Sequence, residues 1–308
     1  MAAIGIDLGG TKVQGAVVEG GEVVADAKVT TPMGVEDVVE AIAACVGRLG
    51  GTKGMDGVGV GAPGVVDVSS GTVVRAPNLP GFDTAVPLAT LLGDALDGAR
   101  VVVDNDVNAA VLAEHRFGAG QDRANLLGVW VGTGVGGGLV LDGRLRRGPG
   151  GVAGEIGHVT TGDDSRCCGC GLPGHLEAFA GRAGMEAEAR RRHATGEPTL
   201  LVDLAGDKRM KSSVFAKALE AGDVMAVALL DDAVAALGPA LASAVALVDL
   251  DLIVVGGGLA EKLGLRFVGR IEQAVRSRLF VRTSPLQVVP AALGDFAGAL
   301  GASLLLGE

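Results

Sequence analysis

The chain opens with short apolar runs separated by glycine pairs. The apolar runs cover residues 3–8, 12–18 and 22–29, and Gly9-Gly10 and Gly20-Gly21 lie between them. This pattern is typical of strands joined by tight turns. An amphipathic stretch at 35–49 follows. The sequence therefore predicts a three-stranded meander and then a helix.

The same alternation of apolar runs and turn residues continues to the end of the chain. It predicts strands at 57–62, 101–104, 126–131, 135–141, 252–255 and 286–290, a hairpin of 65–68 with 72–74, and helices at 86–96, 105–117, 176–193, 212–220, 224–248, 259–279 and 296–306. Asp142-Gly143 is a type I′ hairpin signal. The polar segment 196–213 reads as a surface connection.

The first meander recurs in the second half of the chain. A shift of 122 residues places Gly10 on Gly132 without a gap and gives six identities in fourteen positions. Such an internal repeat predicts two similar α/β domains that face each other across a cleft, which is a favoured ligand site. The alternative is that any two glycine-punctuated meanders look alike.

Composition limits the partners of the protein. The 308 residues allow two domains, and the net charge of −10 argues against nucleic acid or an anionic membrane as the main partner. The longest apolar region, 237–255, contains Asp249 and Asp251, which are poor residues for a bilayer interior. No signal sequence precedes the first strand, and we expect a soluble cytoplasmic protein.

The first glycine turn has the residues of a phosphate site. We expect Gly9 and Gly10 to adopt positive φ and to leave main-chain N–H groups uncovered, while Thr11 adds a hydroxyl and Lys12 a positive charge. Asp7, at the end of the first strand, could face the same phosphates only through a cation. This combination predicts a Mg-nucleotide site.

Two further glycine turns are candidates for the same ligand. Gly132-Thr133-Gly134 repeats the first turn, and Gly256-Gly257-Gly258 follows a buried strand and opens a helix. Ordinary strand-to-helix connections look the same as the latter. Gly59 to Gly64 fits G-x-G-x-x-G, but the strand that follows it excludes a dinucleotide fingerprint.

Polar residues cluster where the strand at 101–104 meets a helix. Helix capping explains one Asp or Asn there, but explains the run Asp104-Asn105-Asp106 less well. In a functional interpretation, Asp106 accepts the proton of a substrate hydroxyl and Asn105 orients the substrate. Phosphoryl transfer to an alcohol needs a carboxylate of that kind.

A second polar cluster combines carboxylate, imidazole and thiol groups. Glu155 and His158 are followed by Cys167, Cys168, Cys170 and His175 within 17 residues. His158, Cys168, Cys170 and His175 supply four ligands for a tetrahedral structural Zn²⁺. Disulfides are the rival, although a cytosolic location disfavours them. Cys167 could replace Cys168 as a ligand.

Taken in order, these motifs resemble those of the ROK family of sugar kinases. The resemblance rests on Asp7-x-Gly-Gly-Thr-Lys12, Asn105-Asp-x-Asn108, Gly132-Thr-Gly-x-Gly-Gly-Gly138, Gly154-Glu-Ile-Gly-His158 and the Cys/His cluster, and it spans nearly the whole chain. It implies the two-domain actin-like and hexokinase-like ATPase fold, with duplicated ribonuclease H-like domains and an interdomain cleft. We expect residues 1–117 with 295–308 in the smaller domain and 118–294 in the larger.

The resemblance also implies roles for single residues. Asp106 would be the catalytic base, and the sugar would be bound by Asn78, Asn105, Glu155, His158 and Glu177. Asp7, Gly9, Gly10, Thr11, Lys12, Thr133 and Gly134 would hold phosphates and Mg²⁺, and Gly256, Gly257 and Gly258 the adenosine of ATP. The family's commoner pattern has a cysteine as the last zinc ligand, where this chain has His175.

Glucose is the expected acceptor, because the motifs resemble those of bacterial glucokinases of this family. Kinases for fructose, mannose, N-acetylglucosamine and N-acetylmannosamine share almost the same residues, and polyphosphate could replace ATP at the same glycines. The family also includes sugar-responsive repressors, and a silent sugar sensor is a further alternative. A homodimer or homotetramer is implied by the resemblance.

Overall fold

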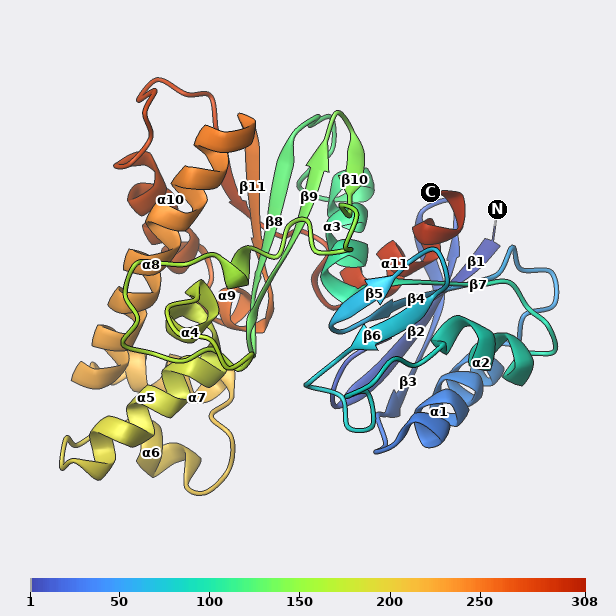
Figure 1. The fold of residues 1–308 in the computed structure, drawn as a ribbon, viewed down its shortest axis with the longest axis horizontal. Helices are drawn as coiled ribbons and strands as arrows, with labels where there is room; N and C mark the ends of the chain where they lie inside the picture. The colour runs from blue at the N-terminus through green and yellow to red at the C-terminus, as the bar shows by residue number, and fades with distance from the viewer. Residues whose placement is uncertain (1) are drawn as a thin grey trace. The chain divides into compact units, whose positions relative to one another are not determined.

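The computed structural model describes residues 2–308, and the chain divides into two compact units (Figure 1). The first unit contains residues 2–122, 138–153 and 292–308. The second contains residues 123–137 and 154–291. The chain forms two five-stranded mixed sheets with helices packed on them.

The first sheet has the strand order β3-β2-β1-β4-β7. Its strands are β1 (Ala2–Leu8), β2 (Lys12–Glu19), β3 (Glu22–Thr30), β4 (Val58–Ala62) and β7 (Val101–Asn105). The first three form the predicted antiparallel meander, and β4 and β7 extend it in parallel. The hairpin of β5 (Val65–Asp67) and β6 (Thr72–Arg75) follows β4, which confirms that the G-x-G-x-x-G match opens no helix.

Helices cover both faces of this sheet. A Cβ on Gly15 would stand 2.9 Å from Cys45 Sγ, so α1 (Val35–Arg48) packs on that face. A Cβ on Gly5 would stand only 1.7 Å from the carbonyl oxygen of Ala299, so α11 (Ala297–Leu304) lies directly on the other face. The remaining helical elements of the unit are α2 (Leu88–Ala95), α3 (Asp106–Phe117), η2 (Gly294–Phe296) and η3 (Leu305–Gly307).

The second sheet repeats the first, with the order β10-β9-β8-β11-β12. Its strands are β8 (Leu126–Val131), β9 (Val135–Leu141), β10 (Arg144–Arg146), β11 (Leu252–Gly256) and β12 (Gln287–Pro290). Again a meander is extended by two parallel strands. Asp142 and Gly143 have φ of 54° and 71°, as a type I′ turn requires. The repeat predicted from the sequence is therefore confirmed by the topology.

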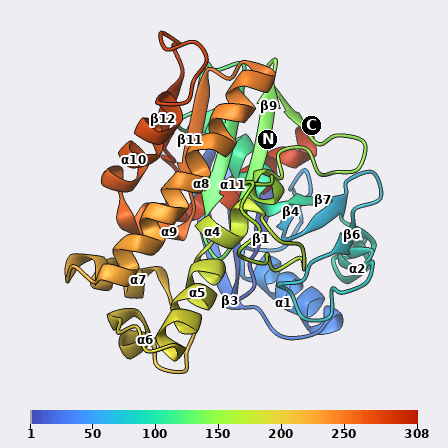
Figure 2. The ribbon, with the colours of Figure 1, turned by 60° about the vertical axis from the view of Figure 1, so that its left-hand side comes forward.

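The helices of the second unit are α4 (Leu176–Ala180), α5 (Arg182–Ala194), α6 (Leu200–Ala205), α7 (Ser212–Glu220), α8 (Val224–Val248), α9 (Gly258–Leu263) and α10 (Leu265–Arg276), with η1 (Ile156–His158) before them. Of these, α9 and α10 contact the parallel strands of the second sheet, and the other α-helices pack against them and against one another (Figure 2). Among residues 2–308, only α8 is long and apolar enough to cross a membrane. Half of its most apolar window is buried, and α4 and α10 pack against it, so within this unit α8 is a core helix.

Three predicted segments of the second unit differ from the structure. The helix expected at 176–193 breaks at Gly181, whose ψ of 140° is extended, and the helix expected at 259–279 breaks at Gly264 with φ of 65°. The segment 196–213, expected to be a surface connection, contains α6. Gly264 is a glycine because its positive φ is open to glycine at little steric cost. The angles of Gly181 are open to any residue, but a Cβ there would stand 2.7 Å from the Glu177 carbonyl oxygen.

Candidate functional site

The first glycine turn joins β1 to β2 and is held from outside by Thr31. The Thr31 hydroxyl donates to the Gly9 carbonyl at 2.6 Å, and the Thr31 amide donates to the Thr11 carbonyl at 3.2 Å. Within residues 2–308, the amides of Gly10 and Thr11 donate to no acceptor. Two main-chain N–H groups in a fixed turn are thus open to an anion.

The conformation predicted for these glycines is wrong. Neither Gly9 nor Gly10 is among the described glycines with positive φ. Space is the reason for glycine here, since a Cβ on Gly9 would lie 3.1 Å from the Lys12 carbonyl oxygen and a Cβ on Gly10 would lie 3.2 Å from that of Asn78. The exposed Asn78 therefore borders the turn through its backbone.

Asp7 and Asp106 are neighbouring carboxyl groups in the first unit. Burial and, second, the charge of Asp106 raise the pKa of Asp7 to about 7, while Lys12 opposes the shift. A carboxylate that is costly to ionise next to another carboxylate is stabilised by a cation between them. Lys12 itself hydrogen-bonds Gln14 at 3.0 Å and lies 3.7 Å from Asp295.

The residue before Asp106 is the N-cap of α3. The side-chain oxygen of Asn105 accepts hydrogen bonds from the amides of Val107 at 2.9 Å and Asn108 at 3.0 Å, and its amide group donates to the Gly64 carbonyl at 2.9 Å. Of the run Asp104-Asn105-Asp106, Asn105 is thus the residue that caps the helix. Its second N–H remains for another partner.

A buried ion pair that the sequence analysis missed lies under this cap. Asp104 is 1% exposed, and both of its carboxylate oxygens accept hydrogen bonds. One accepts from Arg147 Nε at 2.6 Å and the other from the Asn105 amide at 2.7 Å and from Asn108 at 3.1 Å. Asp104 thereby connects the loop after β10 to the start of α3.

The second glycine turn contacts Glu177 on α4. The Glu177 carboxylate accepts from the Val135 amide at 3.0 Å, and a Cβ on Gly134 would stand 2.0 Å from it. Gly157 is needed in the same region, because its Cβ would stand 1.9 Å from the Val135 carbonyl oxygen. The backbone of the turn therefore contacts the Glu177 side chain of α4 on one side and the backbone of the Gly154–His158 segment on the other.

The third glycine turn ends β11 and begins α9. Gly257 has φ of 88°, and a Cβ there would stand 2.7 Å from the Val131 carbonyl oxygen. Packing against β8 alone thus requires glycine at this position. The turn lies next to the end of the strand that leads into Thr133.

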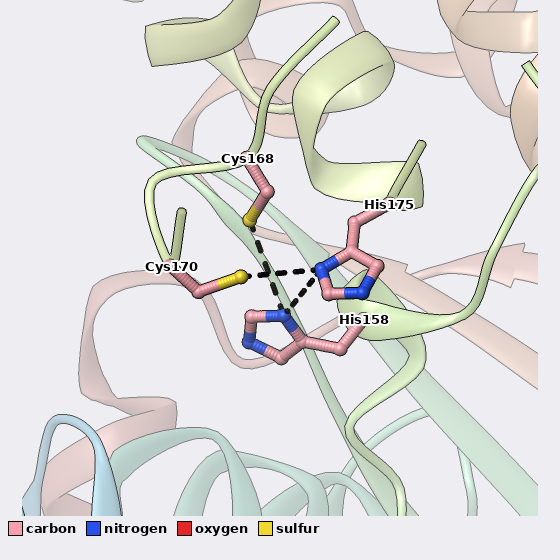
Figure 3. Close-up of side chains that lie close together, drawn as sticks. All are labelled: His158, Cys168, Cys170 and His175. Carbon is pink, nitrogen blue, oxygen red and sulfur yellow. Dashed lines mark hydrogen bonds between the residues drawn. The ribbon is translucent and has the colours of Figure 1, made fainter. Parts of the chain in front are cut away.

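Four predicted metal ligands come together in the second unit. The ligand atoms of His158, Cys168, Cys170 and His175 all lie within 4.8 Å of one another (Figure 3). His158 Nδ1 lies 3.3 Å from His175 Nδ1 and 4.0 Å from Cys168 Sγ, and Cys170 Sγ lies 3.3 Å from His175 Nδ1. Tetrahedral zinc with bonds of 2.0–2.3 Å places its ligand atoms about 3.3–3.8 Å apart. The donor set and its spacing therefore fit zinc.

The loop between the ligands explains which cysteines take part. Cys168 donates its amide to the Leu172 carbonyl at 2.9 Å and receives the Gly171 amide at 2.9 Å, which forms a tight knuckle around Cys170. Cys168 is buried in the group, whereas Cys167 is exposed and lies outside it. All four cysteines, including the buried Cys45 in α1, are free thiols in the structure.

Three of the predicted sugar-binding residues lie at or near the metal group: Glu155, His158 and Glu177. Burial first, and then the charge of Glu177, raise the pKa of Glu155. Glu177 also accepts from Cys168 Sγ at 3.2 Å. His158 turns Nδ1 toward the ligand group, which leaves Nε2 for a different partner. One imidazole can thus serve both predicted roles.

Arg182 is a second residue that the sequence analysis missed. It is the first residue of α5 and donates to the Thr133 hydroxyl at 2.7 Å. With α4 and α5 taken as one helix, nothing marked this position in the sequence. The break at Gly181 is what brings it to the turn.

Comparisons with known proteins identify the relatives of the chain. The sequence profile described as "ROK family" matches residues 3–308. A glucokinase from Streptomyces coelicolor is 35% identical over 311 residues, covering 99% of this chain and 97% of the relative. The crystal structure of a ROK hexokinase from Thermus thermophilus matches with a TM-score of 0.83 at 35% identity, covering 99% and 97% of the two chains.

A liganded relative and two of different function complete the comparison. The structure of a ROK glucokinase from Streptomyces griseus in complex with glucose and AMPPNP matches with a TM-score of 0.81 at 34% identity over 99% of both chains. An N-acetylmannosamine kinase from Vibrio cholerae is 31% identical over the full length of both chains. The structure of a ROK family transcriptional regulator matches with a TM-score of 0.83 at 26% identity. The match covers 99% of this chain and 78% of the regulator.

Proposed function

The chain belongs to the ROK family, and we propose that it is an ATP-dependent glucokinase that transfers the γ-phosphoryl group of ATP to the 6-hydroxyl of glucose. Its repeated α/β sheets are those of the actin-like and hexokinase-like ATPase fold of its relatives. The observation that carries the proposal is in the first unit: Asp106 neighbours Asp7, and the turn after the strand of Asp7 leaves the amides of Gly10 and Thr11 open.

Asp106 is proposed as the catalytic base. It begins α3, and its position is fixed by the Asn105 cap and by the Asp104 ion pair beneath it. A carboxylate held there can accept the proton of a sugar hydroxyl while that oxygen attacks the γ-phosphorus. In such reactions most of the acceleration comes from positioning and electrostatic stabilisation.

Residues of the glycine turns are proposed to hold the nucleotide. The free amides of Gly10 and Thr11, with Gly9 and Lys12, would bind phosphate oxygens, as would Thr133 and Gly134. Gly256, Gly257 and Gly258 would contact the adenosine. Asp7 would hold the Mg²⁺ ion, which neutralises charge on the transferring phosphates.

The sugar is proposed to bind through polar side chains that retain free hydrogen-bonding capacity. Asn78 is exposed, Asn105 keeps one N–H, and His158 keeps Nε2. Glu155 and Glu177 add carboxylates, of which Glu155 is half-buried. Glucose is favoured by the glucokinases among the relatives, including the glucose-bound structure from Streptomyces griseus.

Zinc is proposed to be structural. His158, Cys168, Cys170 and His175 would hold it and so fix the loop 159–175, most of whose residues are exposed. Through His158 the metal would also orient one sugar-binding imidazole. We further propose a cytoplasmic location and a homodimer or homotetramer.

Another hexose is the main alternative, because a relative of similar identity is an N-acetylmannosamine kinase. Fructose, mannose and N-acetylglucosamine are the other candidates. A non-catalytic sensor or repressor is the alternative from a different class, since one structural neighbour is a transcriptional regulator. The intact set of Asn105, Asp106, Glu155 and His158 favours an enzyme.

A matrix of sugars and phosphoryl donors tests the proposal. Purified protein is assayed with each of the five hexoses and with ATP or polyphosphate as donor, and Asp106→Asn serves as the inactive control. We expect the highest kcat/KM with glucose and ATP. A higher kcat/KM with another sugar would assign that sugar as the substrate. No turnover with any pair of sugar and donor would overturn the proposed kinase function.

A further inference from the structure

Arg182 is placed at the second glycine turn by the backbone. Its amide donates to the Gly132 carbonyl at 3.1 Å, and the next amide, of Ala183, donates to the Thr133 carbonyl at 2.9 Å. The first turn of α5 is thus attached directly to the glycine turn. The side chain of Arg182 begins beside Thr133 for this reason.

The guanidinium group of Arg182 spans two hydroxyls. It donates through one terminal nitrogen to Thr133 Oγ1 at 2.7 Å and through the other to Ser212 Oγ at 3.1 Å. Ser212 begins α7, and its Oγ lies 3.8 Å from the position that a Cβ on Gly258 would take. Arg182 therefore stands between the Thr133 turn and the Gly256–Gly258 turn, all within the second unit.

The guanidinium group of Arg182 is hydrogen-bonded by neutral groups, and Glu186 is the carboxylate whose charge acts on it without a direct contact. Within the described residues, no carboxylate forms an ion pair with its guanidinium group, and both its hydrogen-bond partners are neutral. Glu186, one turn along α5, instead pairs with Arg190 at 2.9 Å and accepts from the Met210 amide at 2.9 Å. Burial lowers the pKa of Arg182, the charge of Glu186 opposes this shift, and the charge of Arg209 adds to it. An arginine stays charged under such conditions, so the site favours an anion.

The hydrogen bond to Thr133 also directs that hydroxyl. Thr133 Oγ1 accepts from Arg182, so its own hydrogen is available to a second acceptor. A phosphate oxygen beside Thr133 could then receive one hydrogen bond from the threonine and one from the arginine. Arginine suits this because its planar fork presents parallel donors to phosphate.

We propose that Arg182 binds the phosphate chain of the nucleotide, with Thr133 and Ser212 as its supports. The inference rests on the proposed ATP-dependent function and adds to it a residue that senses the phosphates and not the nucleoside. The rival role is that of a structural connection, in which Arg182 only holds α5 and α7 to the glycine turn.

Binding of ADP and of adenosine separates these roles. Affinities for both ligands are measured by calorimetry for the wild type, Arg182→Gln and Arg182→Lys. We expect Arg182→Gln to weaken ADP binding about 10- to 100-fold, the effect of a lost charged hydrogen bond, and to change adenosine binding less than about threefold. Arg182→Lys, which keeps the charge but not the fork, should fall between them.

A matched control and the stability of each variant complete the test. Arg191→Gln removes a mostly exposed arginine from the same helix, where it pairs with Glu188, and should bind both ligands like the wild type. Equal weakening of ADP and adenosine, with a lowered melting temperature, would show the structural role and overturn the inference. Unchanged ADP binding in Arg182→Gln would also overturn the proposed role of Arg182, but it would leave the proposed kinase function unaffected. If the wild type binds neither ligand, the proposed donor itself is wrong.

Discussion

The guanidinium Nε of Arg147 lies 2.6 Å from Oδ2 of Asp104, two residues before the proposed catalytic base. Because Asp104 is 1% exposed and its other oxygen receives two further hydrogen bonds, the pair is a fixed support for the start of α3. A buried carboxylate left without its cation is strongly destabilising. This pair therefore determines both stability and the position of Asp106.

Replacing Arg147 by Met should cost about 2–4 kcal/mol of stability, somewhat less than the roughly 3–5 kcal/mol of a fully buried pair that is broken, because Arg147 is itself partly exposed. Thermal unfolding measures the loss. Arg146→Met is the matched control, since the neighbouring arginine forms its ion pair with the exposed Asp142 and its replacement should cost less than about 1 kcal/mol. Equal losses in the two variants would contradict the support role. In the kinase assay, kcat of Arg147→Met should fall more than the glucose KM rises.

Asp106→Asn should lower kcat by about 10²–10⁴, the usual contribution of a general base. Glucose affinity should stay within a few fold of the wild type, because the amide keeps the size and hydrogen-bonding ability of the side chain. Turnover and calorimetric glucose binding measure the two effects. Asp94→Asn, at an exposed position in α2, is the control and should leave both unchanged. A turnover within tenfold of the wild type would exclude Asp106 as the base.

The two adjacent cysteines allow a direct test of the metal site. Cys170→Ser should reduce bound zinc from about one per chain to a small fraction, because one of the four ligands is lost. Cys167→Ser should keep the zinc, since this side chain lies outside the group. Elemental analysis of the purified proteins gives the zinc content. Limited proteolysis should cut the 159–175 loop faster in Cys170→Ser alone, and equal zinc in both variants would reject the assigned ligands.

The parts of the fold that the sequence predicted are those set by local patterns. The bounds of α7 and α8 are as predicted, since their apolar residues keep one helical period between clear turn residues. The repeated meander is readable for the same reason. The breaks at Gly181 and Gly264 are not, because a glycine inside a helical pattern costs only about 1 kcal/mol and tertiary contacts decide whether the helix continues.

The candidate site shows the same division. Motif spacing grouped His158, Cys168, Cys170 and His175 correctly as neighbours, because they are close in the chain. Arg147 was missed, since its partner Asp104 lies 43 residues away and the pairing depends on the folded sheet. The reason predicted for glycine at positions 9 and 10 was also wrong. A glycine required by close backbone contact and a glycine required by positive φ look the same in a sequence.

Stability should depend on pH through Asp7. In metal-free protein its pKa is about 7, above the value near 4 of the unfolded chain, so the folded state holds the extra proton between these values. The stabilising contribution is therefore fully present below about pH 4 and is lost as the pH rises through about 7.

Asp7→Asn has no such proton and tests this pH dependence. In EDTA, its stability relative to the wild type should rise between pH 5 and pH 8, by roughly 1–3 kcal/mol given the partial exposure of Asp7. Melting temperatures across this range measure the difference. Asp94→Asn should give a constant difference, and a constant difference for Asp7→Asn would contradict the raised pKa.

The second glycine turn offers two glycines with opposite surroundings. A Cβ on Gly134 would stand 2.0 Å from Glu177 Oε2, whereas a Cβ on Gly132 meets nothing within 4 Å. Gly134→Ala should therefore displace Glu177 from the Val135 amide and lower glucose affinity about tenfold, the effect of one lost hydrogen bond to a charged group. Gly132→Ala should bind glucose like the wild type and melt at the same or a slightly higher temperature, because the unfolded chain loses freedom. Calorimetric glucose binding of the two variants decides the matter: if Gly134→Ala binds as tightly as Gly132→Ala, the position of Glu177 on this turn is not what the sugar requires.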